Sequence, residues 1–167
     1  MVTANGRSLY FAYGSNLLSR RMTSRVPSAS AICVARVDGF RICVGKPGRD
    51  GSGKATLIAS DGSRAWGVVY EIDPLHWARL DACEQGYNRV QLLVTHSQAE
   101  QLLAQTYLAP ETAADPVAFS WYKRFLVDGA REHRLPATYV AELERLPERP
   151  DPRGVNPGTS QASEQRP

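Results

Sequence analysis

The pattern of hydrophobic and polar positions along the chain predicts a fold in which strands outnumber helices. Seven short segments are rich in β-branched and aromatic residues, which favour strands. In one of them, Val90, Leu92 and Val94 alternate with neighbours that include Arg89 and Gln91, as expected for a strand with one face on the core. The predicted strands span residues 8–13, 31–37, 40–45, 54–59, 65–72, 89–96 and 101–108.

Helical signals are fewer. Asp73 followed by Pro74 suits an N-cap and a first helical position, and the apolar residues that follow lead to Glu84, which therefore falls near a helix-to-strand junction. Two further helices are predicted over 117–128 and 136–146, the second opened by Pro136 and carrying apolar residues at helical spacing. A fourth is expected after the turn at 14–16.

Two segments have the composition of a loop or a tail rather than of a strand or helix. Residues 45–53 predict a mobile loop between strands, and they lack the Walker sequence that a phosphate-binding loop requires. From Pro147 onward the chain is rich in proline and polar residues, which cannot bury enough apolar surface to become ordered. We therefore expect one domain over 7–147 and a disordered tail over 148–167.

Composition narrows the classes of function. The chain of 167 residues has 43% hydrophobic residues, 22% charged residues and a formal charge of +3, which is ordinary for a soluble domain. No apolar run reaches the length of a membrane span, and the N-terminus does not resemble a secretory signal. The basic residues are scattered, so neither a membrane nor a nucleic acid is expected as a partner. The cluster Arg20, Arg21 and Arg25 is interpreted as a solvated helix face, with phosphate binding as the less favoured alternative.

The three cysteines and three histidines argue against a metal centre. The cysteines are odd in number and lack the close paired spacing of a disulfide framework or a zinc site, and the histidines lie far apart in the sequence. We therefore expect reduced thiols, a cytoplasmic location, no metal and no cofactor. A homodimer is compatible with the sequence, which does not define an oligomeric state.

The residues around Gly14 predict an anion-binding turn. A buried-type strand enters Gly14-Ser15-Asn16 and a helix follows. Gly14 is able to adopt backbone angles closed to other residues, Ser15 or Asn16 is placed to cap the helix, and the first amides of a helix lack partners within it. An anion is stabilised at such a position. The alternative is a strand-turn-helix connection that binds nothing.

Three stretches of the sequence resemble the gamma-glutamylcyclotransferase family. Residues 10–17 read Tyr-Phe-Ala-Tyr-Gly-Ser-Asn-Leu, like the substrate loop of that family. Residues 66–70 followed by 80–87 resemble its strand, helix and catalytic glutamate, and residues 120–124, 129–130 and 135–139 resemble its C-terminal helices. The resemblance covers about residues 7–147. It implies an α+β fold, a single-domain mixed β-barrel flanked by helices with a pocket at the barrel mouth.

The resemblance also implies an activity and a set of site residues. The expected reaction cyclises a γ-glutamyl amide to 5-oxoproline and releases an amine or an amino acid, with a small-molecule γ-glutamyl compound as substrate. Glu84 matches the family's Leu-Asp-x-x-Glu pattern and is the expected proton shuttle at the end of an apolar helix. The expected substrate-binding residues are Tyr10, Phe11, Ala12, Tyr13, Gly14, Ser15, Asn16, Tyr87, Tyr107 and Tyr122.

Several alternatives remain open at this point. Tyr87 and Tyr107 either orient Glu84 or pack in the core. Ser15 as a nucleophile with a histidine base is disfavoured, because the sequence has no G-x-S-x-G elbow. Gln85 stands where a glycine is frequent in the family, at the expected rim of the pocket. A non-catalytic ligand-binding module and an amide hydrolase are the rival functions.

Overall fold

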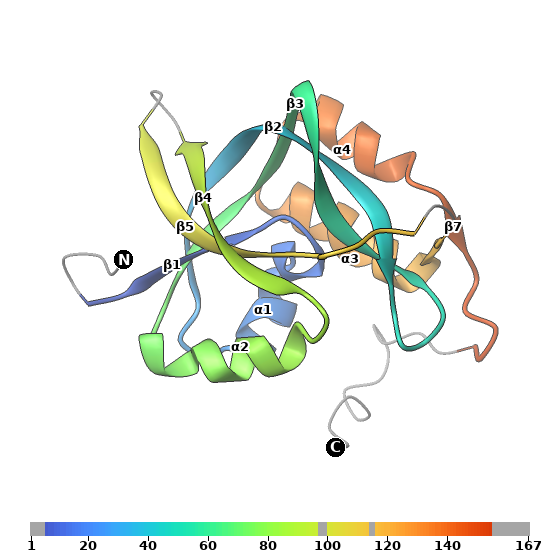
Figure 1. Cartoon of the computed structure of the whole chain (residues 1–167), viewed down its shortest axis with the longest axis horizontal. Coiled ribbons are helices and arrows are strands. Elements are labelled where there is room, and N and C mark those ends of the chain that lie inside the picture. Colours follow the sequence, from blue (N-terminus) through green and yellow to red (C-terminus); the bar gives the residue numbers. More distant parts are fainter. Residues whose placement is uncertain (1–5, 97–99, 114–115, 155–167) are drawn as a thin grey trace.

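The computed structural model describes residues 6–96, 100–113 and 116–154. Figure 1 shows a β-barrel with helices on its flanks. No helix in these described ranges is long and apolar enough to cross a bilayer. The elements in chain order are β1 Ser8–Ala12, η1 Ser15–Leu17, α1 Ser19–Arg25, β2 Ser30–Pro47, β3 Gly53–Ile72, η2 Pro74–His76, α2 Trp77–Cys83, β4 Asn88–His96, β5 Gln101–Leu108, β6 Ala118–Phe119, α3 Ser120–Glu132, α4 Ala137–Glu144 and β7 Glu148–Arg149.

The barrel is closed and mixed, as predicted. Its strands follow the order β1-β3-β2-β4-β5, and β5 closes the circle by pairing in parallel with β1 at Tyr10 and Gln105. The other neighbouring strands of the barrel are antiparallel. Along β4, Val94 is buried whereas Leu93 is 52% exposed, which confirms the predicted alternation. Closure places the end of β1, where the Gly14 turn begins, inside the structure rather than at a sheet edge.

Strands β2 and β3 each contain two segments that were predicted as separate strands. The predicted strands 31–37 and 40–45 are parts of β2, and 54–59 and 65–72 are parts of β3. The pairing of the two strands shifts register between Asp38 and Phe40, and Gly39 there has φ +78°. A bulge of this kind bends a strand without ending it, so an interruption of the apolar pattern does not mark a loop.

Helices α3 and α4 lie together on the side of the barrel away from the β4–β5 hairpin (Figure 1). Helices α1 and α2 lie in the lower part of the same view. The buried face of α3 includes Trp121, Tyr122, Phe125 and Leu126. Gly129 on the same helix has no side chain, which allows the helix to approach the backbone of Leu17 and Leu18 closely: a Cβ at Gly129 would lie 2.5 Å from each. Helix α3 therefore supports the turn that the sequence singles out.

The C-terminal region is more ordered than expected over its first residues. Strand β7 pairs in parallel with β6, and Trp121 Nε1 donates a hydrogen bond of 3.0 Å to Asp151 Oδ2. Residues 118–119 belong to β6, so the helix predicted over 117–128 begins at Ser120. The expectation of a disordered tail is therefore wrong for 148–154, because pairing and the Trp121 contact hold this segment on the domain. The rest of the expected tail, 155–167, lies outside the described residues.

Candidate active site

The turn after β1 adopts a geometry that differs from the predicted one. Residues Ser15–Leu17 form a short 3-10 turn, and α1 begins only at Ser19. Neither Ser15 nor Asn16 caps α1, whose N-cap is Leu18 without a side-chain hydrogen bond. Gly14 has φ −103°, so no left-handed conformation requires a glycine there. A Cβ at Gly14 would lie 3.6 Å from Ala55 Cβ. Because Gly14 lines the cavity, the absence of a side chain there leaves room in the cavity.

The turn nevertheless presents backbone donors, as predicted. The first hydrogen bonds after it run from the amides of Leu17 and Leu18 to the carbonyls of Gly14 and Ser15. Within the described residues, the amides of Ser15 and Asn16 donate no hydrogen bond. Both residues are buried. Buried unpaired amides are costly unless a ligand or water accepts from them, so this turn is a candidate site for an oxyanion or a carboxylate.

Glu84 faces this turn. It lies at the C-cap of α2, and its side chain is 14% exposed. Its Oε1 accepts a hydrogen bond of 2.9 Å from Asn16 Nδ2 and another of 2.9 Å from Arg25 Nη1. An amide and a guanidinium therefore hold this carboxyl group at the end of α2. Among the described residues, Oε2 has no hydrogen-bond partner, so one oxygen positions the carboxyl group and the other is available for proton transfer.

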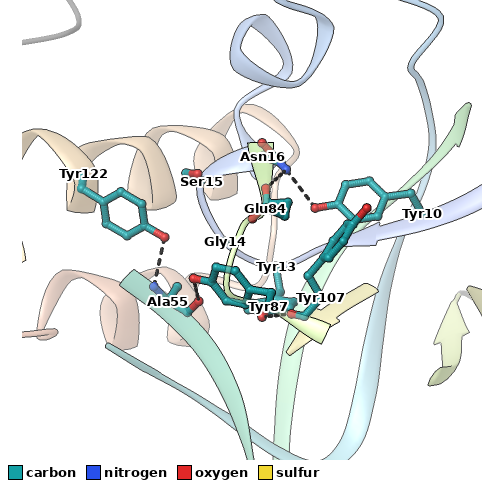
Figure 2. A pocket seen from close by; sticks show the side chains of 10 residues that line it. All are labelled: Tyr10, Tyr13, Gly14, Ser15, Asn16, Ala55, Glu84, Tyr87, Tyr107 and Tyr122. Carbon is teal, nitrogen blue, oxygen red and sulfur yellow. Dashed lines mark hydrogen bonds between the residues drawn. The ribbon is translucent and has the colours of Figure 1, made fainter. Parts of the chain in front are cut away.

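Tyrosines form most of the remaining wall of the cavity in Figure 2, and none of them bonds Glu84. Tyr10 accepts a hydrogen bond of 2.9 Å from Asn16 Nδ2. Tyr122 accepts one of 3.0 Å from the Ala55 amide, and Tyr87 donates one of 2.8 Å to the Ala55 carbonyl. Of the alternatives left open for Tyr87 and Tyr107, the structure shows neither hydroxyl bonded to Glu84, because both donate to other groups. Tyr107 donates to Asp81 Oδ1 at 2.7 Å, and Tyr13 donates to the Tyr107 carbonyl.

Burial keeps these phenols protonated. It raises the pKa of the hydroxyls above the ordinary tyrosine value, and the negative charge of Glu84 adds to the rise. The tyrosines therefore act as hydrogen-bonding groups near neutral pH and not as bases. Glu84 is the one carboxylate among the described residues that line the cavity. The full lining consists of Tyr10, Tyr13, Gly14, Ser15, Asn16, Ala55, Glu84, Tyr87, Tyr107 and Tyr122.

The raised pKa of the buried tyrosines predicts a loss of stability at alkaline pH. Tyrosines of the unfolded chain ionise above about pH 10, whereas buried Tyr13 and Tyr122 keep their protons. The free energy of unfolding should then fall by about 1.4 kcal/mol per pH unit for each such tyrosine. Chemical denaturation between pH 8 and about 11 measures this slope. Tyr122→Phe should reduce it by the contribution of one tyrosine, and an unchanged slope would contradict the assignment.

Asn16 links the turn to Glu84, and its removal should impair turnover. Asn16→Ala deletes the hydrogen bonds to Glu84 Oε1 and to the Tyr10 hydroxyl. A hydrogen bond to a charged group contributes about 1.5–3 kcal/mol, so kcat should fall by about tenfold or more. If Asn16 acts through Glu84, the same substitution should have little further effect in a Glu84→Gln background. Additive losses in this double-mutant cycle would show independent roles.

The structure brings nine of the eleven predicted site residues together. Eight of the ten substrate-binding candidates and Glu84 line one cavity. The other two, Phe11 and Ala12, are fully buried in the core. Side chains alternate along β1, but a strand enclosed on both faces buries both sets. The Phe11 carbonyl accepts a hydrogen bond from Thr106 Oγ1, so this residue supports the strand that carries Tyr10 and leads to Tyr13.

Sequence reasoning missed Arg25. It was interpreted as part of a solvated helix face, but its side chain is 16% exposed and forms the ion pair with Glu84. Arg21 is also drawn inward, since its Nε donates to Ser15 Oγ at 3.1 Å. The interpretation holds only for Arg20, which is exposed. Helical spacing places Arg21 and Arg25 on one face of α1, because they are four residues apart, but it does not indicate that this face points towards the cavity.

A wider groove adjoins the cavity. It has a volume of about 280 Å³ and shares Ser15, Glu84, Tyr87 and Tyr122 with the cavity. The turn between β2 and β3 forms one of its walls. We had predicted a mobile loop over residues 45–53, but the strands run to Pro47 and from Gly53, and Ser52 accepts from Gly48 across the turn at 2.7 Å. This turn is a defined part of the site.

The disfavoured nucleophile mechanism finds no geometric support. Ser15 Oγ accepts from Arg21, whereas His76 bonds Ser28 and His133 bonds Ser19. His96 pairs with Glu100. No group of three or more metal-ligating side chains is present in the part of the chain that the structure describes. The chemistry that the cavity offers is therefore proton transfer at a carboxyl group beside unpaired amides.

Comparisons with known proteins identify relatives of this chain. The model of the AIG2-like family matches residues 64–143. The human gamma-glutamylcyclotransferase is 33% identical over 147 residues, which cover 83% of this chain and 78% of the human protein. The mouse protein of the same name gives the same identity and coverage.

Solved structures share the fold of this chain. A structure of a gamma-glutamyl cyclotransferase superposes with a TM-score of 0.80 at 31% identity, covering 86% of this chain and 89% of that one. A yeast gamma-glutamyl cyclotransferase specific to glutathione superposes with a TM-score of 0.61 at 18% identity, covering 83% of this chain and 94% of that one, which shows a shared fold alone. From its identity to the human protein over most of both chains, this chain belongs to the gamma-glutamylcyclotransferase family.

Proposed function

We propose that this enzyme cyclises a γ-glutamyl amide to 5-oxoproline and releases the amine or amino acid. The observation that carries the proposal is the position of Glu84, whose carboxyl group is held by Asn16 and Arg25 opposite the unpaired amides of Ser15 and Asn16. This pairs a proton-transfer group with oxyanion donors, which are the two elements that acyl transfer requires. The relatives named gamma-glutamylcyclotransferase support the same reaction.

The nucleophile in this proposal belongs to the substrate. The α-amine of a γ-glutamyl compound reaches its own γ-carbonyl carbon and closes a five-membered lactam. Well-oriented intramolecular reactions have effective molarities of about 10⁵–10⁸ M. Cyclisation therefore outcompetes attack by water, provided that the cavity holds the γ-glutamyl group in a bent conformation. The buried tyrosine wall would exclude water and define that conformation.

Glu84 moves the protons. Its Oε2 takes a proton from the α-ammonium group, and the resulting amine forms the new C–N bond. The γ-carbonyl oxygen becomes an oxyanion, which the amides of Ser15 and Asn16 stabilise. The tetrahedral intermediate then breaks the original C–N bond as Glu84 returns the proton to the departing nitrogen, and the new lactam nitrogen gives up its second proton, so that the released amine leaves as an ammonium group. Atoms balance between one donor and two products, so we propose a reaction without a cofactor.

The experiment is an assay of product identity. Purified enzyme is incubated with γ-glutamyl-alanine, γ-glutamyl-lysine and glutathione, and 5-oxoproline and glutamate are quantified. We expect 5-oxoproline from at least one donor. Free glutamate would instead indicate an amide hydrolase, and binding of a donor without any product would indicate a ligand-binding module. Either result would overturn the proposal.

The finer assignments follow from the same proposal. All three cysteines are free, which suits a reducing compartment, so we propose a cytoplasmic location and a role in the metabolism of γ-glutamyl compounds such as glutathione. A homodimer is a separate proposal, which light scattering of the purified protein would check.

A further inference from the structure

The groove beside the cavity begins where the proposed leaving group departs. Glu84, Tyr87 and Tyr122 line both spaces, so an amide whose nitrogen receives a proton from Glu84 lies at their boundary. If the γ-glutamyl half occupies the cavity, the released half extends into the groove. The properties of the groove therefore select the leaving group.

The groove is strongly basic. Five cationic side chains line it, against the carboxylates of Asp50 and Glu84. Arg25 pairs with Glu84 at 2.9 Å and Lys54 pairs with Asp50 at 2.9 Å. The cationic residues are Arg21, Arg25, Lys46, Arg49 and Lys54. A groove with this excess of positive charge favours an anion.

Lys46 and Arg49 contribute positive charge to the groove that no carboxylate of the described residues neutralises. Neither forms an ion pair with a carboxylate within the described ranges. Lys46 Nζ lies 4.7 Å from the centre of the Tyr87 ring, and it donates to the Pro47 carbonyl at 3.2 Å. Because Tyr87 lines both cavity and groove, the ammonium group is held at the boundary between them.

Arg49 is held on the rim by Gln85. Its Nη2 donates a hydrogen bond to Gln85 Oε1, and both residues line the groove. This hydrogen bond depends on the carboxamide of Gln85, since a glycine there would have no side chain to accept it. Gln85 therefore holds a guanidinium over the groove, and the remaining guanidinium donors suit a carboxylate.

We propose that the groove selects donors whose leaving group carries two carboxylates, that is, an acidic amino acid or an acidic peptide. This inference rests on the proposed function. Lys46 and Arg49 are the specificity-determining residues, each facing one of the two carboxylates. A neutral γ-glutamyl amine leaves both cations without a counterion and is a poor donor.

The test compares γ-glutamyl-glutamate with γ-glutamyl-glutamine, which differ in one charge and little in size. An exposed ion pair contributes about 0.2–1 kcal/mol, or up to about fivefold in an equilibrium. We expect kcat/KM for γ-glutamyl-glutamate to exceed that for γ-glutamyl-glutamine by about threefold to fivefold, and a γ-glutamyl alkylamine to rank last. The ratio should shrink at about 0.5 M salt, where exposed charges are screened.

Substitutions in the groove test whether Lys46 and Arg49 cause the preference for γ-glutamyl-glutamate. Arg49→Gln and Lys46→Gln should each bring the two kcat/KM values closer together. Gln85→Gly should act like a mild form of Arg49→Gln. Arg41→Gln is the matched control, since Arg41 is exposed on β2 and does not line the groove. A preference that survives both groove substitutions would overturn the assignment.

The outcomes separate this inference from the proposed function. Formation of 5-oxoproline from all donors at equal kcat/KM would overturn the inference and leave the function intact. If no donor yields 5-oxoproline, the function fails, and calorimetric titration of the wild-type protein decides the inference. Tighter binding of γ-glutamyl-glutamate that Arg49→Gln abolishes would support the groove as an anion site, whereas equal or absent binding would overturn it.

Discussion

Glu84→Gln is expected to lower kcat by at least about 100-fold while the protein remains folded. A carboxamide keeps the size of the carboxyl group and accepts from Asn16, but it cannot take a proton from the ammonium group or return one to the leaving nitrogen. General acid–base groups contribute about 10²–10⁴-fold in rate. The loss should appear mainly in kcat, because the tyrosine wall and the turn that bind the donor are unchanged.

The control for this substitution is Glu142→Gln on α4, an exposed glutamate outside the cavity. It should leave kcat unchanged. Circular dichroism and a thermal melt of Glu84→Gln would verify that the fold persists, with a modest decrease in stability because Arg25 loses its charged partner. Near-normal turnover of folded Glu84→Gln would remove Glu84 from the mechanism.

Gly129→Ala is expected to produce the second large effect, at a distance from the reacting groups. The added Cβ would lie 2.5 Å from Leu17 C and from Leu18 N. These are backbone atoms, so no side-chain rotation relieves the clash, and either α3 or the turn must move. Overpacking of this kind costs about 1–3 kcal/mol, which corresponds to a Tm lower by roughly 2–12 °C. Because the turn provides the oxyanion donors, kcat should also fall.

Gly14→Ala is the matched comparison. At that position the nearest atom to a new Cβ is Ala55 Cβ at 3.6 Å, followed by the Tyr122 hydroxyl at 3.8 Å. These are ordinary van der Waals contacts. We expect a smaller loss of Tm than for Gly129→Ala and a reduced affinity for the donor, since the methyl group enters the cavity. A Tm of Gly129→Ala equal to that of Gly14→Ala would contradict the packing argument.

Local sequence patterns predicted the strands and helices because each element depends on the order of polar and apolar residues that are close together in the chain. Alternation in β4 and the Asp73-Pro74 signal each need only a few residues to be recognised. The same local reading failed where tertiary pairing overrides it. One strand was divided at Asp38 because a bulge interrupts its apolar pattern, and Glu148–Arg149 was assigned to a tail because its pairing with β6 joins segments about 30 residues apart.

For the site, the order of residues along the chain determined the barrel strands, the turn at 14–16 and, through family resemblance, Glu84. Only the tertiary structure decided what Glu84 faces. Arg25 and Glu84 are 59 positions apart, and Arg49 and Gln85 are 36 apart, so no local pattern relates them. An ion pair depends on distance in space, which closure of the barrel sets when it brings the start of β3, the end of α2 and the turn after β1 around one cavity.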